Sequence, residues 1–173
     1  MKRILVVVDM QNDFIDGALG TKEAEGIVGR VVEEIRSYPA GNIYATRDTH
    51  GRDYLKTNEG KYLPVEHCIE GSMGWQIQEE VAAAMPQAIL VDKPAFGSLE
   101  LAELLWEEAQ KEELEIELVG LCTDICVVSN ALLLKAKLPE TKIIVKAACC
   151  AGVTPKSHEE ALATMKMCQV EVV

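Results

Sequence analysis

Aromatic rings, basic side chains and long apolar runs are all scarce in this chain of 173 residues. Aromatic residues make up 5% of the sequence, and 17 Lys and Arg stand against 28 Asp and Glu, which gives a net charge of -11. Phosphate backbones and anionic lipids attract basic surfaces, so we expect neither a nucleic acid nor a membrane partner. Apolar runs such as Ile4 to Val8 are far shorter than the roughly 20 residues that a membrane-spanning helix requires.

An export signal is also missing from the beginning of the sequence. Met1-Lys2-Arg3 leads directly into an apolar segment, and no small-residue cleavage site follows. Cysteines in such a chain are expected to be reduced thiols rather than disulfides. The sequence therefore predicts a cytoplasmic protein with six free thiols: Cys68, Cys122, Cys126, Cys149, Cys150 and Cys168.

Short β-branched runs alternate with longer runs of helical period, which predicts one α/β domain over residues 1–173. The apolar runs do not alternate with polar residues, so both faces of the sheet should be covered. We predict a three-layer α-β-α, doubly wound fold with a mostly parallel six-stranded sheet. The expected strands are Ile4–Val8, Asn42–Ala45, Ala88–Val91, Ile116–Val119, Lys142–Val145 and Val170–Val173. The expected helices are Lys22–Ser37, Gly74–Met85, Leu99–Gln110, Thr123–Lys137 and one that begins at Thr154-Pro155.

Reactive side chains follow four of the expected strands. Ligands of open α/β sheets bind outside the carboxyl ends of the strands, so these positions are the candidates for chemistry. Asp9 follows the first strand, Asp48 the second and Lys93 the third. Cys122 and Cys126 follow the fourth. The fold would bring all of them to one edge of the sheet.

Cys126 is expected in the first turn of a helix, where unpaired N–H groups and the helix dipole favour a thiolate. A nearby Lys93 ammonium would favour the thiolate further, and Asp9 could take the thiol proton. The same N–H groups could bind an oxyanion. Simpler interpretations are open for each residue: Asp9 as a turn cap, Lys93 as a solvated side chain and Cys126 as a small buried one.

Residues 47–73 fit neither a helical nor a strand period, and long loops in compact domains are usually functional or mobile. This metal or substrate loop contains Asp48, His50, Glu59 and His67. Imidazole and carboxylate groups suit zinc, iron or manganese. A polar loop without a metal is the alternative, because the sequence does not show that the four side chains converge.

Three segments of the chain, taken together, resemble the isochorismatase-like family of cysteine hydrolases, and within it the nicotinamidases. They are Val8-Asp9-Met10-Gln11-Asn12-Asp13-Phe14, Asp92-Lys93-Pro94-Ala95-Phe96 and Gly120-Leu121-Cys122-Thr123-Asp124-Ile125-Cys126-Val127. The third is the most specific, because it matches the pattern Gly-x-x-Thr-Asp-x-Cys-Val after a strand. The resemblance extends over essentially the whole chain.

The resemblance implies a catalytic group of Cys126 as nucleophile, Asp9 as base and Lys93 as the third member. It implies a cis peptide bond between Leu121 and Cys122, with the N–H groups of Cys122 and Cys126 forming the oxyanion hole. The expected reaction is the hydrolysis of nicotinamide to nicotinate and ammonia through a cysteine thioester.

The loop of residues 47–73 resembles the metal loop of the nicotinamidases. The resemblance implies one divalent ion, with zinc placed before iron and manganese, bound by Asp48, His50, Glu59 and His67. In that subfamily the metal binds the pyridine nitrogen of the substrate. The expected partner is thus a small amide, and assembly of identical copies is left open.

Three aromatic residues are the expected walls of the substrate pocket: Phe14, Phe96 and Tyr62, which is the nearest match to the aromatic residue that precedes the last metal-binding histidine. Two other functions are considered. One is a metal-free amidase of the same family that acts on carbamoyl or ureido groups. The other is a non-enzymatic phosphoacceptor signalling domain, which would need an acceptor Asp after the middle strand. His158, at the start of the last expected helix, is interpreted as structural.

Overall fold

Six parallel strands form one sheet in the computed structural model, which describes residues 1–173. The strand order is β3-β2-β1-β4-β5-β6, and every neighbouring pair is parallel. The strands are β1 (Lys2–Val8), β2 (Ile43–Asp48), β3 (Ile89–Lys93), β4 (Leu114–Leu121), β5 (Lys142–Ala151) and β6 (Glu171–Val172). Each of them lies at a predicted strand, so the predicted fold class is confirmed.

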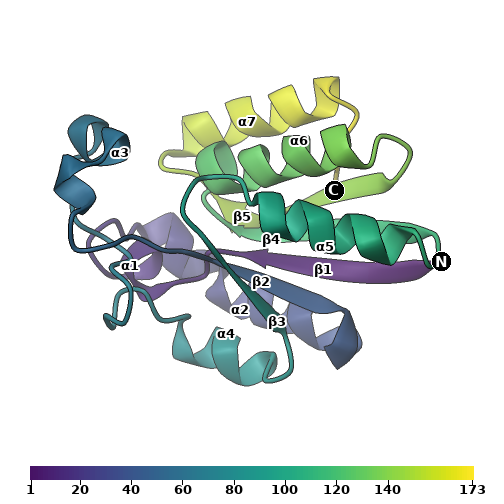
Figure 1. Ribbon diagram of the computed structural model, residues 1–173, viewed down its shortest axis with the longest axis horizontal. Helices are drawn as coiled ribbons and strands as arrows, with labels where there is room; N and C mark the ends of the chain where they lie inside the picture. The colour runs from purple at the N-terminus through teal and green to yellow at the C-terminus, as the bar shows by residue number, and fades with distance from the viewer.

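Helices cover both faces of this sheet (Figure 1). The α-helices are α1 (Asn12–Ile15), α2 (Lys22–Arg36), α3 (Asn58–Tyr62), α4 (Glu79–Ala84), α5 (Leu99–Ala109), α6 (Val128–Lys137) and α7 (Pro155–Met167). Shorter turns are η1 (Ala40–Asn42), η2 (Tyr54–Lys56) and the π-helical η3 (Thr123–Val127). Helices α1, α2 and α4 lie on one face, and α5, α6 and α7 lie on the other.

Strand β1 shows why its apolar run does not alternate with polar residues. Leu5 and Val7 face the core under α2, whereas Ile4, Val6 and Val8 face the core under α5 and α6. All five side chains are buried. Full burial of each such side chain contributes roughly 1.5–3 kcal/mol, so the centre of the sheet is a rigid support for the residues that follow it.

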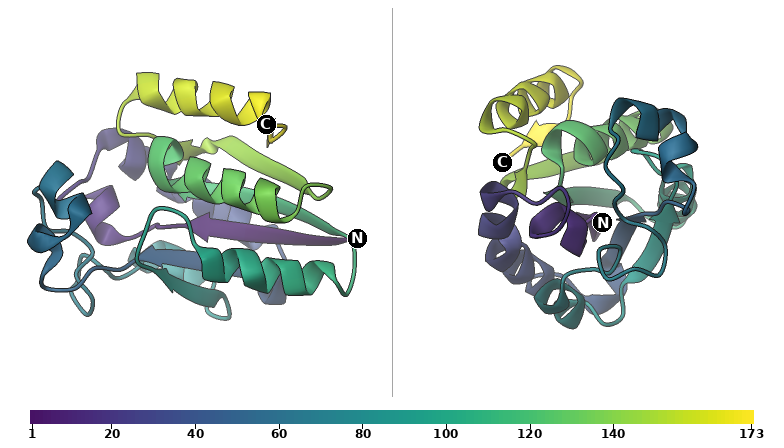
Figure 2. Two further views of the ribbon diagram at one scale, coloured as in Figure 1. Left: turned by 45° about the horizontal axis from the view of Figure 1, so that its top comes forward. Right: turned by 90° about the vertical axis from the view of Figure 1, so that its left-hand side faces the viewer.

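The carboxyl ends of the strands define the functional edge of the molecule. The strand order reverses between β1 and β4, and in doubly wound sheets ligands bind in the crevice at this point. The right-hand view of Figure 2 looks onto this end, with α1 and α3 in front of the sheet. Asp9 and Cys122 directly follow the two strands at the reversal.

One predicted helix, Gly74–Met85, is wrong in its first half, because only Glu79–Ala84 is helical. The preceding backbone is engaged elsewhere: Ile77 pairs with Gln11, and the Gln78 N–H donates to the carbonyl of Met10. The Gln78 side chain then caps α4 by accepting from the Val81 N–H. Tertiary hydrogen bonds therefore outweigh the helical period of this segment.

The start of α7 follows the sequence prediction. The Thr154 side chain accepts a hydrogen bond from the Ser157 N–H, and Ser157 bonds back to the Thr154 backbone. Pro155 occupies the first helical position, where its missing N–H costs nothing. The predicted start of this helix is confirmed.

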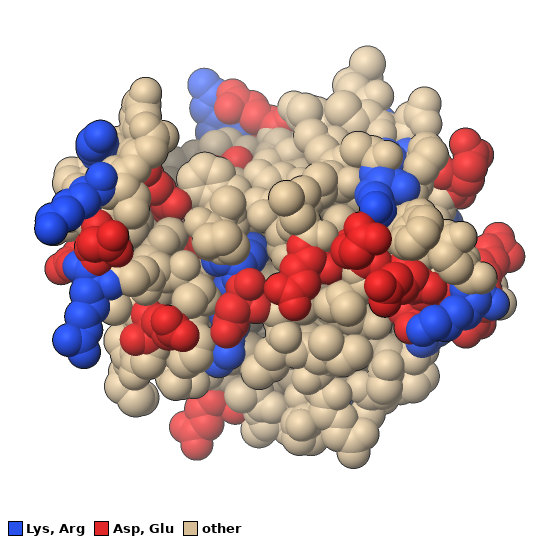
Figure 3. All heavy atoms as spheres, viewed as in Figure 1, with Lys and Arg blue, Asp and Glu red and all other residues tan.

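Acidic side chains gather along α5 on the face shown in Figure 3. This helix contains four glutamates and no basic residue. None of the helices combines the length and apolar character that crossing a membrane demands.

A buried carboxyl group lies midway along β4. Glu117 faces Glu34 of α2, and its Oε1 atom has no hydrogen-bond partner. Glu34 itself pairs with Lys146. Burial, followed by the charge of Glu34, raises the pKa of Glu117 to about 7. The folded chain thus holds a proton here that the unfolded chain releases at lower pH.

Glu117 should make the protein less stable as the pH rises from about 4.5 to 7, because the unfolded state loses this proton first. Glu117→Gln should remove this loss, so its stability relative to wild type should rise by about 1–3 kcal/mol between pH 5 and pH 8. Urea unfolding at both pH values measures the difference. Glu113→Gln, at an exposed position before β4, is the matched control. An equal effect of Glu117→Gln at both pH values would contradict the assignment.

Candidate active site

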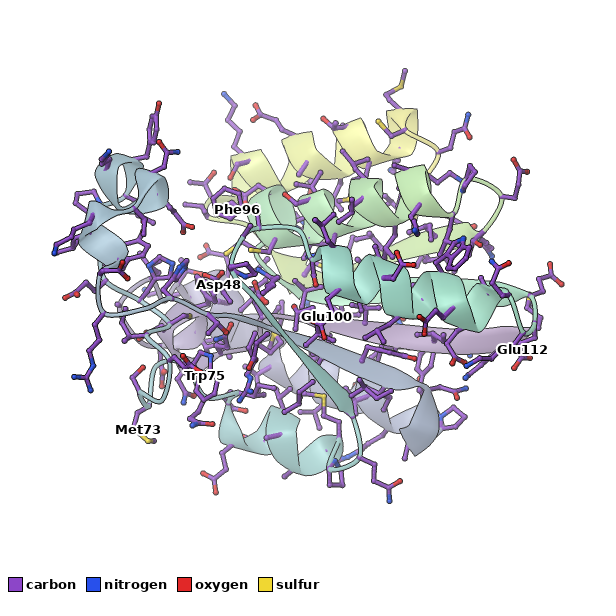
Figure 4. All side chains as sticks on the ribbon, in the orientation of Figure 1. Asp48, Met73, Trp75, Phe96, Glu100 and Glu112 are labelled. Carbon is purple, nitrogen blue, oxygen red and sulfur yellow. The ribbon has the colours of Figure 1, made fainter.

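A cavity of about 720 Å³ opens at the carboxyl ends of the strands. Its walls come from the loop after β2, the segment after β3, the turn after β4 and the β5–α7 connection. Figure 4 shows Asp48 and Phe96 at this end of the sheet. The predicted site residues that line the cavity are Phe14, Asp48, His50, Glu59, Tyr62, His67, Phe96, Cys122 and Cys126. Asp9 and Lys93 are fully buried beneath it.

The Lys93 ammonium contacts three of the predicted site residues, Asp9, Cys126 and Asp48. Its Nζ lies 2.7 Å from Asp9 Oδ2, 3.3 Å from Cys126 Sγ and 3.6 Å from Asp48 Oδ1. Nζ also donates to the carbonyl of Ala95 at 3.0 Å. One ammonium group thus touches the ends of three strands and the start of the helix after β4.

Asp9 is held by a hydroxyl group as well as by the ammonium. Thr46 Oγ1 donates to Asp9 Oδ1 at 2.7 Å, and it also accepts from the Asp9 N–H at 3.2 Å. Asp9 has φ = 46°, a left-handed conformation that costs energy for a residue with a Cβ and often marks a functional turn. Thr46 was not singled out from the sequence, although it directly follows the predicted strand Asn42–Ala45.

Burial and mutual charges shift the pKa values of Cys126, Asp9 and Lys93. Burial, followed by the charge of Asp9, raises the pKa of the Cys126 thiol well above its usual range, which opposes the thiolate that the sequence favours. Burial also raises the pKa of Asp9. Burial would lower the pKa of Lys93, but Asp9, Cys126 and Asp48 outweigh it and raise that pKa. The Lys93 ammonium therefore lies beside two acidic groups whose pKa values burial raises.

Cys126 sits in a π-helical turn that leads directly into α6. The expected cis peptide bond between Leu121 and Cys122 is present. Asn130, one turn after Cys126, is fully buried and donates to the carbonyls of Cys126 at 2.8 Å and of Phe96 at 3.1 Å. The sequence reasoning missed Asn130. Its spacing of four residues from Cys126 on a helix was the available signal.

The loop after β2 brings four ligand groups together. One ligand atom from each of Asp48, His50, Glu59 and His67 lies within 4.8 Å of the others. Asp48 Oδ2 lies 2.8 Å from His50 Nε2 and 3.4 Å from His67 Nε2. Glu59 Oε1 lies 3.6 Å and 3.5 Å from the same two nitrogens. The convergence that the sequence left open is therefore present.

The chemistry of this donor set fits a divalent cation. Burial lowers the pKa of His67, but Asp48 and Glu59 outweigh it and raise that pKa to about 10. Two carboxylates thus draw a proton onto the imidazole, which is the place that a cation would take. His67 Nδ1 lies 2.8 Å from the carbonyl of Val65, a contact that orients Nε2 toward the cluster.

Gln11 fixes the backbone of Asp48 with its side-chain amide. Its Oε1 accepts from the Asp48 N–H at 2.7 Å, and its Nε2 donates to the carbonyls of Asp48 at 2.8 Å and Trp75 at 2.9 Å. Gln11 is fully buried. It stands two residues after Asp9 in the first family segment, so the motif contained the signal, but the sequence gave it no role.

His158 lies closer to the site than its sequence position indicated. Its Nδ1 is 2.7 Å from Thr123 Oγ1, next to Cys122. The neighbouring Asp124 carboxylate accepts from the Val153 N–H at 3.1 Å with each oxygen. These contacts attach the turn after β4 to the start of α7, so the structural interpretation of His158 gains a specific partner.

The three expected aromatic walls occupy two different depths. Phe14 is buried, with its ring centroid 5.5 Å from that of His67. Phe96 and Tyr62 line the outer part and are largely exposed. The inner cavity therefore has one aromatic wall, beside the metal-binding group.

Comparison with known proteins gives the family. A model of the isochorismatase domain matches residues 3–173, almost the whole chain. The chain therefore belongs to the isochorismatase family. The nicotinamidase/pyrazinamidase of Mycobacterium tuberculosis is 24% identical over 184 residues, which cover 99% of this chain and 98% of that protein.

Solved structures share the whole architecture. The pyrazinamidase of Pyrococcus horikoshii, solved in complex with zinc, has 26% identity and a TM-score of 0.81, covering 100% of this chain and 99% of that one. The nicotinamidase/pyrazinamidase of Bacillus subtilis has 25% identity and a TM-score of 0.84, covering 100% of both chains. The predicted family and fold are both confirmed.

The purified protein should bind one zinc ion at the four-residue cluster. Asp48→Asn should abolish tight binding, because it removes the charge that both histidines face. Gln11→Leu should weaken binding by about 10–100-fold, the usual effect of losing a partner that orients a ligand. Competition with a chromophoric chelator measures both affinities.

Glu66→Gln is the matched control for this experiment, since Glu66 is exposed and adjoins His67 without belonging to the cluster. Thermal unfolding of each variant without metal verifies that it folds. Unchanged zinc affinity in folded Asp48→Asn would show that the ion binds elsewhere.

Proposed function

We propose that this chain is a metal-dependent cysteine amidohydrolase that converts nicotinamide to nicotinate and ammonia. The observation that carries the proposal is the position of Asp48, whose two oxygens face different groups. Oδ2 faces the two histidines, and Oδ1 lies 3.6 Å from Lys93 beside Cys126. A cation site and a nucleophile share one cavity. This arrangement suits a ring that carries an amide for the nucleophile and a ring nitrogen for the cation. The nicotinamidase names of the relatives support this substrate.

The first half of the proposed reaction uses Cys126 and Asp9. Burial raises the pKa of the thiol, and Asp9 takes the thiol proton as Sγ attacks the amide carbon. Burial raises the pKa of Asp9, which makes it a stronger base than an exposed aspartate. Lys93 stays an ammonium ion and stabilises the negative charge that passes between Asp9 and Sγ.

The N–H groups of Cys122 and Cys126 are proposed to bind the oxyanion of the tetrahedral intermediate. Asp9 then gives its proton to the leaving nitrogen, ammonia departs and a thioester remains on Cys126. In the second half, Asp9 takes a proton from a water molecule that attacks the thioester. Nicotinate leaves, and the proton returns to the thiol.

Asp48, His50, Glu59 and His67 are proposed to hold one divalent ion, zinc before iron or manganese. Bound there, the ion supplies a Lewis-acidic contact for the ring nitrogen of the substrate. Phe14 packs against the ring of His67 and provides an apolar wall for the substrate ring. The six free cysteines support a cytoplasmic location.

Cys126→Ala should eliminate turnover, because it removes the nucleophile. Asp9→Asn should lower kcat by about 10²–10⁴-fold, because the amide cannot accept the proton. Cys149→Ala, which removes another buried thiol away from the cavity, is the matched control and should keep activity. Circular dichroism verifies the fold of each variant. Activity that survives in Cys126→Ala but not in Cys122→Ala would transfer the nucleophile to Cys122.

Ammonia release tests the substrate and the metal together. The zinc-loaded protein should release ammonia from nicotinamide, should lose this activity after chelation and should regain it with zinc. Benzamide, which has the same carboxamide but no ring nitrogen, is the matched control substrate and should react much more slowly. Release that is indifferent to chelation would favour the metal-free carbamoyl or ureido amidase instead.

A further inference from the structure

The cavity is larger than the substrate proposed for it. Cavities of about 300–1,000 Å³ enclose drug-sized ligands, and this one measures about 720 Å³. Nicotinamide is one ring with one carboxamide. Its amide must reach Cys126, which is buried at the inner end, so a single ring leaves the outer part of the cavity unfilled.

Four apolar side chains surround this outer part. We call Tyr62, Leu63, Phe96 and Val153 the rim. Their exposed fractions are 86%, 36%, 43% and 52%. Single exposed apolar residues are ordinary on protein surfaces, but these four come from three separate segments and line the same cavity.

The charges of the cavity also separate an inner from an outer part. Apart from the two histidines, the ionisable groups on its walls are Asp48, Glu59, Tyr62 and the two cysteines. Asp48 and Glu59 belong to the four-residue cluster, and Cys122, half-buried, and Cys126, buried, are thiols with raised pKa values. No Lys or Arg lines the cavity. A ligand that reaches the rim meets mainly apolar surface, with Thr57 and Asn58 as neutral polar neighbours.

We propose that the rim is a second binding site, for an apolar extension of the acyl group of the substrate. The substrates would then be heteroaromatic carboxamides that carry a further ring or an apolar chain. The inference rests on the proposed function. Ammonia is the leaving group and is small, so the acyl group alone can extend from Cys126 toward the rim.

The test compares nicotinamide with 5-phenylnicotinamide on the zinc-loaded protein. Position 5 is opposite the ring edge that carries the nitrogen and the carboxamide, so the phenyl group points away from both anchors. Apolar contacts typically change specificity by about 10–200-fold, so kcat/KM for the phenyl compound should exceed that for nicotinamide by about tenfold. Calorimetry should show that the product 5-phenylnicotinate binds more tightly than nicotinate.

Val153→Asn should lower the preference for the phenyl compound over nicotinamide by about tenfold, because it places a polar group on the rim. Leu55→Asn is the matched control, since Leu55 is 50% exposed and lies outside the cavity. It should leave the preference unchanged. An equal decrease in both variants would refute a specific role of the rim.

The inference would be overturned if the protein hydrolyses nicotinamide but does not hydrolyse 5-phenylnicotinamide and binds its product acid only weakly. The proposed function would remain intact. The rim would then be closed to ligands, for example by a second copy of the chain. If neither amide releases ammonia, the proposed function fails and the inference fails with it. The two failures are therefore distinguishable.

Discussion

The ammonium group of Lys93 is the contact on which the rest of the site depends. It is 1% exposed, and an isolated charge would not be stable at that depth. Asp9, Asp48 and Cys126 surround it, and each comes from a different part of the chain. The parallel register of β2 and β3 places Asp48 beside Lys93, so strand pairing itself sets this contact. Removing the ammonium would leave two carboxylates facing each other without compensation.

Neutral polar side chains fix the geometry around this charge. Thr46 holds one oxygen of Asp9, Gln11 holds the backbone of Asp48, and Asn130 holds the carbonyl of Cys126. All three are buried and hydrogen-bonded, so they satisfy the backbone without adding charge. The reactive groups are thereby positioned by residues that do not alter the charge balance of the site.

The group around Lys93 and the four-residue cluster of Asp48, His50, Glu59 and His67 are supported by different parts of the fold. Asp9 and Lys93 stand at strand ends above two apolar cores. Glu59 is on the short helix α3, which stands apart from the body in Figure 1, and His67 is farther along the same loop. Backbone pairing of His50 with Ile69 closes this loop, and Asp13 accepts from its Cys68 N–H at 2.8 Å. Metal binding and loop folding are therefore expected to be coupled, whereas the nucleophile has a rigid base.

The sequence alone determined the strands, most helices and the candidate site residues, because these follow from apolar periodicity and from position after a strand. It also predicted the cis bond before Cys122 by family resemblance. Tertiary structure decided the rest, because it depends on groups that are distant in sequence. Packing brought Glu59 and His67 to Asp48, and pairing with Gln11 prevented helix formation before Gln78. Burial beside Asp9 raised the pKa of the Cys126 thiol, since the desolvation of a charge depends on the completed fold.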